Sequence, residues 1–260
     1  MKKISVILLS ALSILFTTSC NKDSTNNNNN TAKVAFHLTD APGDFEAVYI
    51  DVQSVAVGTE TKGWIEIPIS RRGVYNLLDF RNGLDTLLCQ IDLPVGRVNQ
   101  IRMVLGSNNS VKVDGTVYPL KTPSAMQSGL KFNVQYDLIA NTSYNIWIDF
   151  DAARSIVENG NGDYSLKPVI RTYTDLTNGK IKGSVLPLYA FTVVYATNGA
   201  DTYSAIPNAD GSYMFCGLPE GSYTVKFDAK DGTGISDLEV KNVQVTFGVI
   251  TDLGNLMLLP

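Results

Sequence analysis

The sequence predicts an all-β protein built from two tandem antiparallel β-sandwiches of immunoglobulin-like type. Three observations support this fold class. Short segments of alternating apolar and polar residues, rich in β-branched side chains, recur along the chain. Turn residues separate these segments, and helical periodicity is sparse. A polar break at residues 175–180 divides the segments into two groups, so we expect one domain over residues 33–175 and another over residues 179–260.

The segment ahead of the two sandwiches has the organisation of a lipoprotein signal followed by a disordered tether. Lys2 and Lys3 precede an apolar run at residues 4–16, which is shorter than the about 20 residues of a transmembrane helix. Small residues then lead to Cys20, whose thiolate could accept a diacylglyceryl group. We therefore expect residues 1–19 to be a signal peptide and Cys20 to carry the lipid that anchors the chain.

The tether is expected to extend from Cys20 to residue 32. Its residues are polar and include five consecutive asparagines, so they cannot bury apolar surface. No aspartate directly follows the cysteine, and the Lys22-Asp23 pair resembles a short export signal of surface lipoproteins in one group of Gram-negative bacteria. The expected location is therefore the outer membrane, with lipid anchoring, and the orientation toward the periplasm or the cell surface stays open.

The charge of the chain excludes two classes of partner. Charged residues make up 18% of the 260 residues, and the formal net charge is -4. A mildly acidic chain without a basic run has no electrostatic footprint for nucleic acid or for an anionic membrane surface. Contact with the membrane is therefore expected through the lipid alone, and a glycan or another envelope protein remains as a partner.

The alternating segments of the first domain predict a series of short strands. Asp114-Gly115 is a strong hairpin signal between two of them. Residues 79–90 and 151–158 could each hold a few helical turns. The predicted strands lie at residues 47–57, 64–69, 98–105, 111–118, 132–138, 144–150 and 169–174.

In the second domain, glycine-containing turns precede aromatic residues that open strands. Asp210-Gly-Ser-Tyr213 and Leu218-Pro-Glu-Gly-Ser-Tyr223 are two such turns. Because glycine supplies the unusual backbone angles of the turn, Tyr213 and Tyr223 are predicted to enter the core. Strands are expected at residues 183–185, 191–195, 218–225 and 243–246.

Ordered sequence blocks in the first domain resemble a known family. The blocks begin with His37-Leu-Thr-Asp-Ala-Pro-Gly, Leu93-Pro-Val-Gly-Arg and Asp149-Phe-Asp-Ala-Ala-Arg, and the last continues to Arg171. Over residues 33–174 they resemble the bacterial lipoprotein family called domain of unknown function 4382. This resemblance implies a lipoprotein without an assigned activity.

The second domain resembles a different family. Its two glycine turns and the closing pattern at residues 243–254 resemble the carboxypeptidase regulatory-like domains, over residues 179–260. The resemblance implies a small seven-stranded, transthyretin-like sandwich, which is classed among carbohydrate-binding-like folds. It also implies a domain without catalytic residues of its own.

Two cysteines remain besides Cys20, and they fall in different predicted domains. Cys89 and Cys216 lie on apolar stretches, where cysteines are usually buried hydrophobic residues. A disulfide is permitted in an oxidising compartment, so pairing of the two stays open.

The sequence lacks the residues of a nucleophilic active site, and we expect no enzymatic activity. His37 is the single histidine and lies in an expected first strand, which disfavours a Ser-His-Asp or Cys-His arrangement. Paired carboxylates remain, because Asp149 and Asp151 share one strand face and would lie about 6–7 Å apart. A carboxylate-dependent hydrolase is therefore an alternative to the plainer interpretation of solvated strand-edge acids.

No cofactor is expected, with calcium as the one alternative. Calcium binds about six to eight oxygen ligands. The chain lacks the residue order of an EF-hand, and Asn-Gly pairs also form ordinary turns. The candidate calcium ligands are Asp149, Asp151, Asn159, Asn161 and Asp163.

A glycan site would need an exposed aromatic ring beside polar groups. Trp64 and Trp147 are candidates, and Trp147 shares a strand face with Asn145. If that face is open, Trp147 and Asn145 could bind a sugar. If both faces of the strand are covered, Trp147 belongs to the core.

Two short motifs resemble the O-glycosylation acceptor pattern of the same bacterial group. They place candidate sites at Ser24 in the tether and at Thr86 in the first domain. Ser24 is the more accessible of the two, because the tether is expected to be unfolded.

The function that these observations favour is a membrane-anchored, non-catalytic binding or scaffold module of the cell envelope. A carbohydrate-binding accessory lipoprotein, a carboxylate-dependent hydrolase and a structural subunit of a surface assembly are the alternatives. An open sheet edge would indicate the last of these. No motif identifies the ligand.

Overall fold

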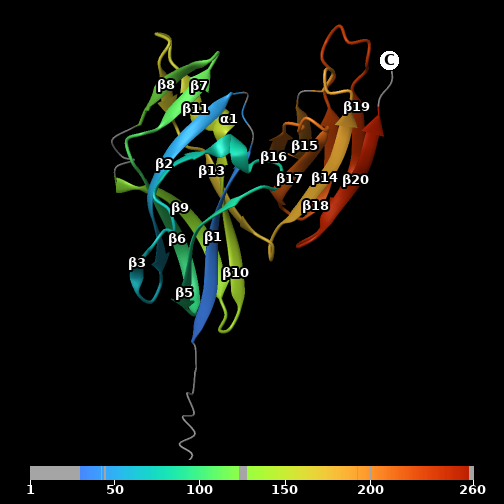
Figure 1. Cartoon of the computed structure of the whole chain (residues 1–260). Coiled ribbons are helices and arrows are strands. Elements are labelled where there is room, and N and C mark those ends of the chain that lie inside the picture. Colours follow the sequence, from blue (N-terminus) through green and yellow to red (C-terminus); the bar gives the residue numbers. More distant parts are fainter. Residues whose placement is uncertain are drawn as a thin grey trace, which may run out of the picture.

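The computed structural model describes residues 30–41, 43, 45–122, 128–191, 193–199 and 201–257. These residues form two β-sandwiches that lie side by side (Figure 1). The expected signal peptide and the tether up to residue 29, including Cys20 and Ser24, lie outside the described residues. No helix in the described part of the chain is long and apolar enough to cross a membrane.

The first sandwich contains a four-stranded sheet with the order β13-β10-β1-β5. Within it, β1 pairs in parallel with β10, whereas β1 pairs with β5 and β10 pairs with β13 in antiparallel fashion. The strands of this sheet are β1 (Thr31–Ala41), β5 (Thr86–Pro94), β10 (Ser143–Asp151) and β13 (Ile170–Thr174).

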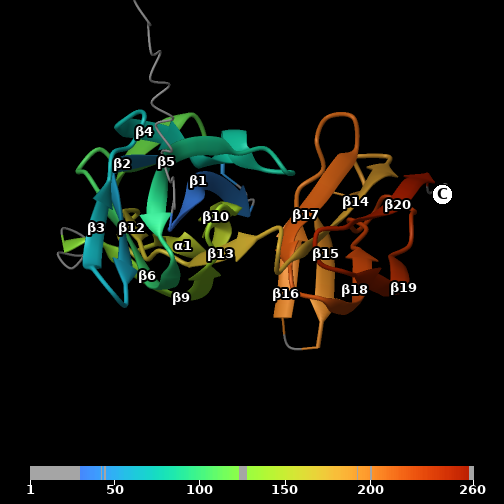
Figure 2. The same ribbon diagram turned by 90° about the horizontal axis from the view of Figure 1, so that it is seen from below.

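The second sheet of this sandwich has nine strands in the order β11-β12-β8-β7-β2-β6-β9, with β3 and β4 also paired on β2. Seen from below, the two sheets surround a single core (Figure 2). Two short helical turns, η1 (Leu77–Phe80) and α1 (Ala152–Ser155), lie between strands. The strands are β2 (Ala47–Thr59), β3 (Gly63–Ile67), β4 (Gly73–Asn76), β6 (Gly96–Leu105), β7 (Ser110–Val113), β8 (Thr116–Lys121), β9 (Leu130–Leu138), β11 (Ile156–Glu158) and β12 (Tyr164–Leu166).

The core of the first sandwich follows from the alternation of its strands. Val34, Phe36 and Leu38 of β1 point to one face and are fully buried. They belong to the same cluster as Ile101 and Met103 of β6 in the facing sheet. Because full burial of such a side chain stabilises the fold by about 1.5–3 kcal/mol, this cluster holds the two sheets together.

The second sandwich begins after a short linker and pairs a three-stranded sheet, β17-β14-β20, with a four-stranded sheet, β16-β15-β18-β19. Tyr213 and Tyr223 are 2% and 1% exposed, which confirms that both enter the core. The strands are β14 (Gly179–Leu186), β15 (Val194–Asn198), β16 (Asp201–Ala205), β17 (Ser212–Leu218), β18 (Gly221–Phe227), β19 (Leu238–Val245) and β20 (Ile250–Met257).

The predicted fold class and one predicted hairpin are confirmed. Most of the described residues lie in strands and few lie in helical turns, and the strands form two sandwiches. β7 and β8 pair across Asp114 and Gly115, which have φ values of +48° and +73°. These positive angles are what a tight hairpin turn requires.

Three sequence predictions about local structure need correction. The helix at residues 79–90 is wrong, because η1 ends at Phe80 and β5 starts at Thr86. In β5, the adjacent residues Leu88 and Cys89 are both buried, because the register with β1 shifts opposite them. Two buried residues in a row interrupt the alternation of buried and exposed residues by which a strand is recognised in the sequence. At residues 151–158 only the single turn of α1 is helical. The sheets are also not purely antiparallel, because β1–β10, β8–β12 and β14–β20 are parallel pairs.

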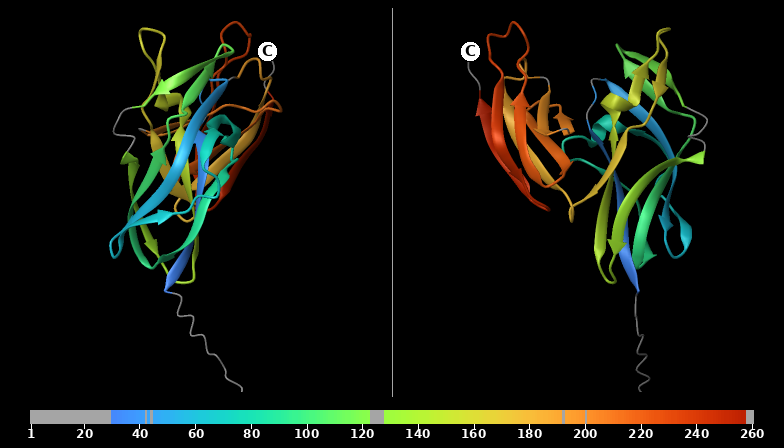
Figure 3. Two further views of the ribbon diagram at one scale, coloured as in Figure 1. Left: turned by 60° about the vertical axis from the view of Figure 1, so that its left-hand side comes forward. Right: turned by 180° about the vertical axis from the view of Figure 1, so that it is seen from behind.

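The first domain covers the edge of β17 in the second domain. The segment after η1, residues 81–85, extends from the first sandwich to the second (Figure 3). Side chains from the first domain and the linker then bond backbone groups of β17 that face away from β14. Met214 N donates to Asn82 Oδ1 at 3.3 Å, Cys216 O accepts from Arg171 Nη2 at 3.0 Å, and Gly217 O accepts from Asn178 Nδ2 at 3.0 Å.

Close packing at two glycines brings the domains together. A Cβ atom on Gly83 would lie 2.6 Å from Met214 Sδ, and a Cβ atom on Gly217 would lie 2.3 Å from the Tyr173 ring. Real Cβ atoms essentially never show contacts this short, so a side chain at either glycine would force its neighbour to shift, and the Met214 side chain can shift more easily than the Tyr173 ring. The two sandwiches are therefore docked tightly at this junction.

Replacing Gly217 with alanine is expected to destabilise the chain. The new Cβ would clash with Tyr173, and the φ of +67° adds backbone strain. Gly232→Ala is the matched control, since its φ is +80° and nothing lies within 4 Å of its Cβ position. Strain in the left-handed region costs about 1–2 kcal/mol in either variant, and overpacking should cost Gly217→Ala about 1–3 kcal/mol more. Urea unfolding measures both, and equal losses would contradict the tight junction.

Candidate functional site

The register of β1, β10 and β13 builds two rows of side chains on the outer face of the four-stranded sheet. Residues two apart along a strand point to the same side of a sheet. The rows are therefore set by which residues pair across the strands. One row is His37, Trp147 and Tyr173, and the next is Thr39, Asp149 and Arg171.

The first row is a stack of aromatic rings. The Trp147 ring lies 5.3 Å from the His37 ring and 5.4 Å from the Tyr173 ring, measured between centroids. Asp85 joins the stack, because it accepts from Trp147 Nε1 at 2.9 Å and pairs with His37 Nδ1 at 2.7 Å. Lys180 Nζ, from the second domain, lies 5.3 Å from the centre of the Trp147 ring. His37 therefore has a structural role in this stack.

Trp147 does not present an open aromatic face. Only 8% of it is exposed, because its neighbours in the stack and the second domain cover it. Of the two interpretations that the sequence left open, the one in which both faces of the strand are covered is therefore correct for Trp147. Asn145 lies two residues earlier on β10 and is exposed, but without an open ring beside it. Of the two tryptophans, Trp64 is the exposed one at 39%, and the Arg102 guanidinium lies 4.7 Å from its ring.

In the second row, Arg171 links the two domains. Its Nε donates to Asp149 Oδ2 at 2.5 Å, and its Nη2 donates to the backbone of Cys216 in β17. The guanidinium carbon also lies 4.6 Å from the centre of the Tyr203 ring in β16. Burial opposes the charged form of Arg171, but the Asp149 carboxylate outweighs it and raises the pKa of the guanidinium. Arg171 therefore keeps its charge beside Asp149 and contacts both domains at one point.

Two atoms of this ion pair lack a hydrogen-bond partner within the described residues. They are Oδ1 of Asp149 and Nη1 of Arg171, and both are buried. Asp149 as a whole is 2% exposed. Buried polar atoms in native proteins nearly always have a partner, so this pair leaves one acceptor and one donor unsatisfied where the domains meet, and neither atom is exposed to solvent.

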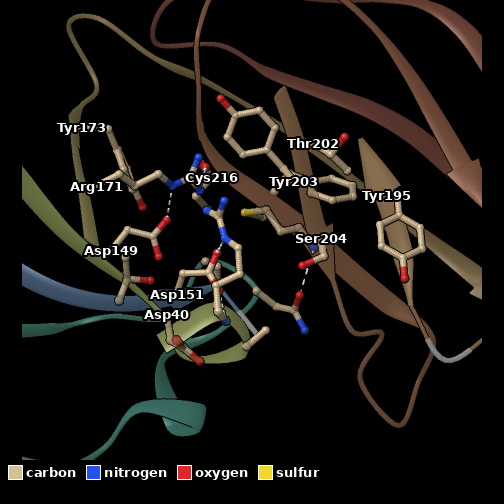
Figure 4. Close-up of a pocket in the computed structure, with 18 of the residues that line it drawn as sticks. Asp40, Asp149, Asp151, Arg171, Tyr173, Tyr195, Thr202, Tyr203, Ser204 and Cys216 are labelled. Carbon is tan, nitrogen blue, oxygen red and sulfur yellow. Dashed lines mark hydrogen bonds and ion pairs between the residues drawn. The ribbon is translucent and has the colours of Figure 1, made fainter. Parts of the chain in front are cut away.

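A cleft of about 570 Å³ lies between the two domains above this pair, and we call it the interdomain cleft. Its volume is within the roughly 300–1,000 Å³ of small-molecule sites. In Figure 4, Asp149 and Arg171 face Thr202, Tyr203 and Ser204 across the cleft. The lining residues are Thr39, Asp40, Ala41, Asn82, Gly83, Asp149, Asp151, Ala153, Arg154, Arg171, Tyr173, Tyr195, Asp201, Thr202, Tyr203, Ser204, Met214, Phe215 and Cys216.

Acidic residues outnumber basic ones in the interdomain cleft. Four aspartates line it, against two arginines. Asp151 is the N-cap of α1, where its two oxygens accept from the backbone N and the Nε of Arg154 at 2.9 and 2.6 Å. Asp40 is 5% exposed and accepts from Ala152 N at 3.1 Å. Burial first, and then the nearby charge of Asp149, raise the pKa of Asp40 well above its ordinary value.

The acids that the sequence singled out for hydrolysis both line the cleft. Each of them is engaged by an arginine, Asp149 by Arg171 and Asp151 by Arg154. Asp40 was not singled out by the sequence analysis. Asp40 and Arg171 both lie within the sequence blocks that resemble the family. This resemblance is the one signal in the sequence that could have identified them.

The candidate calcium ligands divide between two places. Asp149 and Asp151 lie in the cleft, whereas Asp163 pairs with Lys121 and accepts from Asn161 in the loop between β11 and β12. Asn159 bonds Ser165 nearby. No group of three or more acidic, histidine or cysteine residues in the described ranges has metal-site geometry. Calcium binding stays an untested prediction.

The remaining candidate residues lie away from the cleft or at its edge. Thr86 is the first residue of β5, paired with Leu38 and partly buried. Cys89 is buried in the first domain and Cys216 lines the cleft, and both are free thiols. Glycosylation at Thr86 stays a prediction, as do the sites at Cys20 and Ser24.

A family model described as domain of unknown function (DUF4382) matches residues 31–168, more than half of the 260-residue chain. This match confirms the resemblance predicted for the first domain. None of the curated proteins matches the sequence. The resemblance of the second domain to carboxypeptidase regulatory-like domains stays a prediction.

The solved structures with some similarity include bacterial pilins. The Bacillus anthracis TIE protein is 11% identical, with 83% of this chain and 35% of that one covered and a TM-score of 0.26. A streptococcal ancillary pilin is 13% identical, with 90% and 64% covered and a TM-score of 0.21. A minor pilin of Streptococcus agalactiae is 8% identical, with 87% and 96% covered and a TM-score of 0.23. The chain spans less than two thirds of the first two, and similarity this low assigns no function.

Asp40→Asn is expected to stabilise the protein increasingly as the pH rises. The fold raises the pKa of Asp40 above its ordinary value of 3.8, so the folded state holds this proton more tightly than the unfolded chain. The wild-type protein therefore loses stability as the pH rises from that value through the raised one. Asparagine keeps an oxygen for Ala152 N and has no proton to lose.

Denaturant unfolding from about pH 4 to about pH 8 measures this effect. The free energy of unfolding of Asp40→Asn, minus that of the wild type, should grow across the range. Asp201→Asn, at an exposed position of the same cleft, is the control. A difference that does not change with pH would refute the burial argument for Asp40.

Arg171→Met is expected to destabilise the protein by leaving the Asp149 carboxylate buried without a partner. Breaking a buried ion pair on one side costs about 3–5 kcal/mol. Because the Arg171 side chain is 31% exposed, the lower end, about 3 kcal/mol, is expected. The double variant Asp149→Leu/Arg171→Met removes both charges and should recover part of the loss in urea unfolding. A double variant less stable than Arg171→Met would contradict this account.

Proposed function

We propose that this chain, which belongs to the family described as domain of unknown function (DUF4382), is a non-catalytic binding protein of the cell envelope that takes its ligand in the interdomain cleft. The observation that carries the proposal is the Asp149–Arg171 pair. It lines a cleft of ligand size and joins the two domains whose residues form the cleft walls. Residues of both domains line this cleft, so a ligand there would contact the whole folded unit.

Binding is favoured over catalysis by how the charged groups of the cleft are used. Asp149 and Asp151 each hold an arginine, so neither is free to act as a nucleophile or base. His37, the single histidine, is committed to the aromatic stack with Trp147. General acid and base catalysis needs a group that can reach a substrate proton and change its protonation state during the reaction.

A carboxylate-dependent hydrolase is the second candidate, because of Asp40. A carboxyl with a raised pKa beside an ionised one is the arrangement of an acid catalyst. Turnover of chromogenic glycosides or esters that Asp40→Asn abolishes would favour this candidate over the binding protein. No turnover in the wild type would leave binding as the function.

Anchoring through Cys20 is part of the proposal. The signal, the small residues before the cysteine and the polar tether support it. β1 starts at Thr31, so the last two residues of the expected tether belong to this strand, and its other end, Ala41, lines the cleft. At about 3.3 Å per residue, the 11 residues of β1 separate the tether from the cleft by about 33 Å. A protein anchored in this way in the outer membrane would hold its cleft away from the bilayer.

We assign the second domain to the carboxypeptidase regulatory-like domains as a further part of the proposal. Its seven strands from β14 to β20, in sheets of three and four, have the strand number that the resemblance implies. Its glycine turns lead into Tyr213 and Tyr223 in the core. In this chain the domain supplies one wall of the cleft, formed by β15, β16 and β17.

Cys20→Ala is expected to move the protein from the membrane fraction to the soluble fraction. A diacylglyceryl group and a further acyl chain give stable anchoring, and no other membrane contact is expected. Cell fractionation with immunoblotting measures the shift, and Cys89→Ala is the control because that thiol is buried in the first domain. Protease treatment of intact cells then tests whether the protein faces outwards. Retention of Cys20→Ala in the membrane would refute lipid anchoring.

A further inference from the structure

We propose that two exposed apolar turns, residues 246–250 and 139–142, rest on the surface of the lipid bilayer to which the chain is anchored. This inference goes beyond the cleft and rests on the anchoring part of the proposed function. It starts from the turn between β19 and β20, where Phe247, Val249 and Ile250 are 48%, 50% and 48% exposed. Exposed turns are usually polar, and grouped apolar side chains on a surface mark contact with a partner or a membrane.

The linker between the domains extends this apolar surface. Gly248 N donates to Asn178 O at 3.0 Å, so the turn lies directly against the linker, in which Leu176 is 58% exposed. The turn carries no charge, and the one acid of the linker, Asp175, pairs with Lys180 at 3.8 Å. The result is a neutral apolar surface. We call it the apolar tip, and its residues are Leu176, Phe247, Val249 and Ile250.

The apolar tip lies toward the end of the molecule from which the chain leads back to Cys20. β14 starts at the linker and β20 pairs with it in parallel, so the tip is at the start of both strands. In Figures 1 and 3 this end of the second sandwich points the same way as the start of β1 in the first. The segment from Cys20 to Thr31 reaches at most about 40 Å when fully extended. An anchored chain therefore keeps the tip near the bilayer and turned toward it.

A second apolar turn lies beside the point where the tether joins the fold. Ile139, between β9 and β10, is 66% exposed. Asn141 N of the same turn donates to Thr31 O at 2.9 Å, which ties the turn to the first residue of β1. The chain that carries the lipid therefore holds Ile139 next to the membrane. Contacts from both domains would fix the orientation of the protein, which a tether alone leaves free.

A second copy of the chain, paired along β20, is the main competing occupant. β20 is an edge strand, and an open apolar edge can add a strand from another chain. The exposed residues of β20 that follow the turn are Asp252, Gly254, Asn255 and, at its end, Met257. The apolar surface is thus concentrated at the turn and does not continue along the edge, and a charge such as that of Asp252 opposes edge pairing. Both features favour the bilayer.

The two turns orient the protein and do not replace the lipid. They offer only a few side chains to the bilayer, whereas stable anchoring takes two lipid signals. Release of Cys20→Ala from the membrane is therefore still expected. The contact also needs no basic surface, because its residues are uncharged, and this agrees with the acidic net charge of the chain.

The test is fluorescence quenching of the mature lipoprotein in phosphatidylcholine vesicles with and without brominated acyl chains. Phe247→Trp places a probe in the apolar tip. Tyr189→Trp is the matched control in the same domain, because Tyr189 is 61% exposed and lies beyond the other end of β14. The emission of the wild-type protein is subtracted. Since interfacial side chains reach the boundary of the acyl chains, the Phe247→Trp probe should lose about half of its emission or more to brominated lipid. Ile139→Trp should be quenched too, and Tyr189→Trp should not.

Removing the neighbouring apolar side chains tests whether the apolar tip drives the contact. Leu176→Ser/Val249→Ser, added to the Phe247→Trp chain, should abolish most of the quenching. Val117→Ser is the control for this change, because Val117 is 56% exposed on β8 and lies outside both turns. Circular dichroism confirms that each variant is folded.

Three outcomes would overturn the inference. They are no quenching of Phe247→Trp, equal quenching of Phe247→Trp and Tyr189→Trp, and quenching that Leu176→Ser/Val249→Ser leaves unchanged. No quenching together with a dimer in sedimentation equilibrium would assign the apolar tip to a second copy of the chain.

A second sample separates this contact from the anchoring proposal. It carries an N-terminal hexahistidine tag in place of Cys20 and is held on vesicles that contain a chelating lipid. If the mass of the native protein shows no lipid but the tagged sample is quenched, the anchoring proposal fails and the apolar contact stands. If the lipid is present and neither sample is quenched, the apolar contact alone fails.

Discussion

The ion pair between Asp149 and Arg171 is the constraint on which the arrangement of this protein depends. Asp149 is almost completely buried, and a buried carboxylate is stable only beside a positive charge that also satisfies its hydrogen bonds. Arg171 supplies this charge from the neighbouring strand and bonds one of the two carboxylate oxygens. Its second nitrogen then bonds Cys216 O, and its flat face lies against Tyr203. A charge buried in the first domain is thereby compensated by a side chain that also fixes the position of the second.

The contact between the domains also covers an exposed sheet edge of the second sandwich. β17 is an edge strand, and an exposed edge can pair with other chains. Side chains of the first domain and the linker bond its outward groups, and Gly83 and Gly217 allow the surfaces to approach closely. Covering this edge removes it as a site of strand addition. A role as a subunit of a surface assembly would therefore have to use another edge, such as that of β20.

Local sequence predicts the strands of this fold better than their partners. Alternation and glycine turns give the all-β class, the hairpin at Asp114 and the burial of Tyr213 and Tyr223, because each depends on a few neighbouring residues. The parallel pairing of β1 with β10 joins Lys33 to Ser143, and no local pattern reports a contact across such a separation. That pairing sets the rows of side chains on the outer face. The sequence could therefore name Trp147 and Asp149 but could not say that one would be covered and the other would form the cleft floor.

The same buried pair explains why the cleft would discriminate by hydrogen bonding rather than by charge. Asp149 and Arg171 neutralise each other, Asp151 and Arg154 do the same at the rim, and burial favours the uncharged form of Asp40. Little net attraction is left for an ion that must lose its water to enter. What is left are the uncharged polar groups of the cleft walls, such as those of Thr202 and Ser204. Such groups distinguish ligands by the positions of their hydrogen-bonding atoms, and because residues of both domains line the cleft, a ligand bound there would also reinforce the contact between the domains.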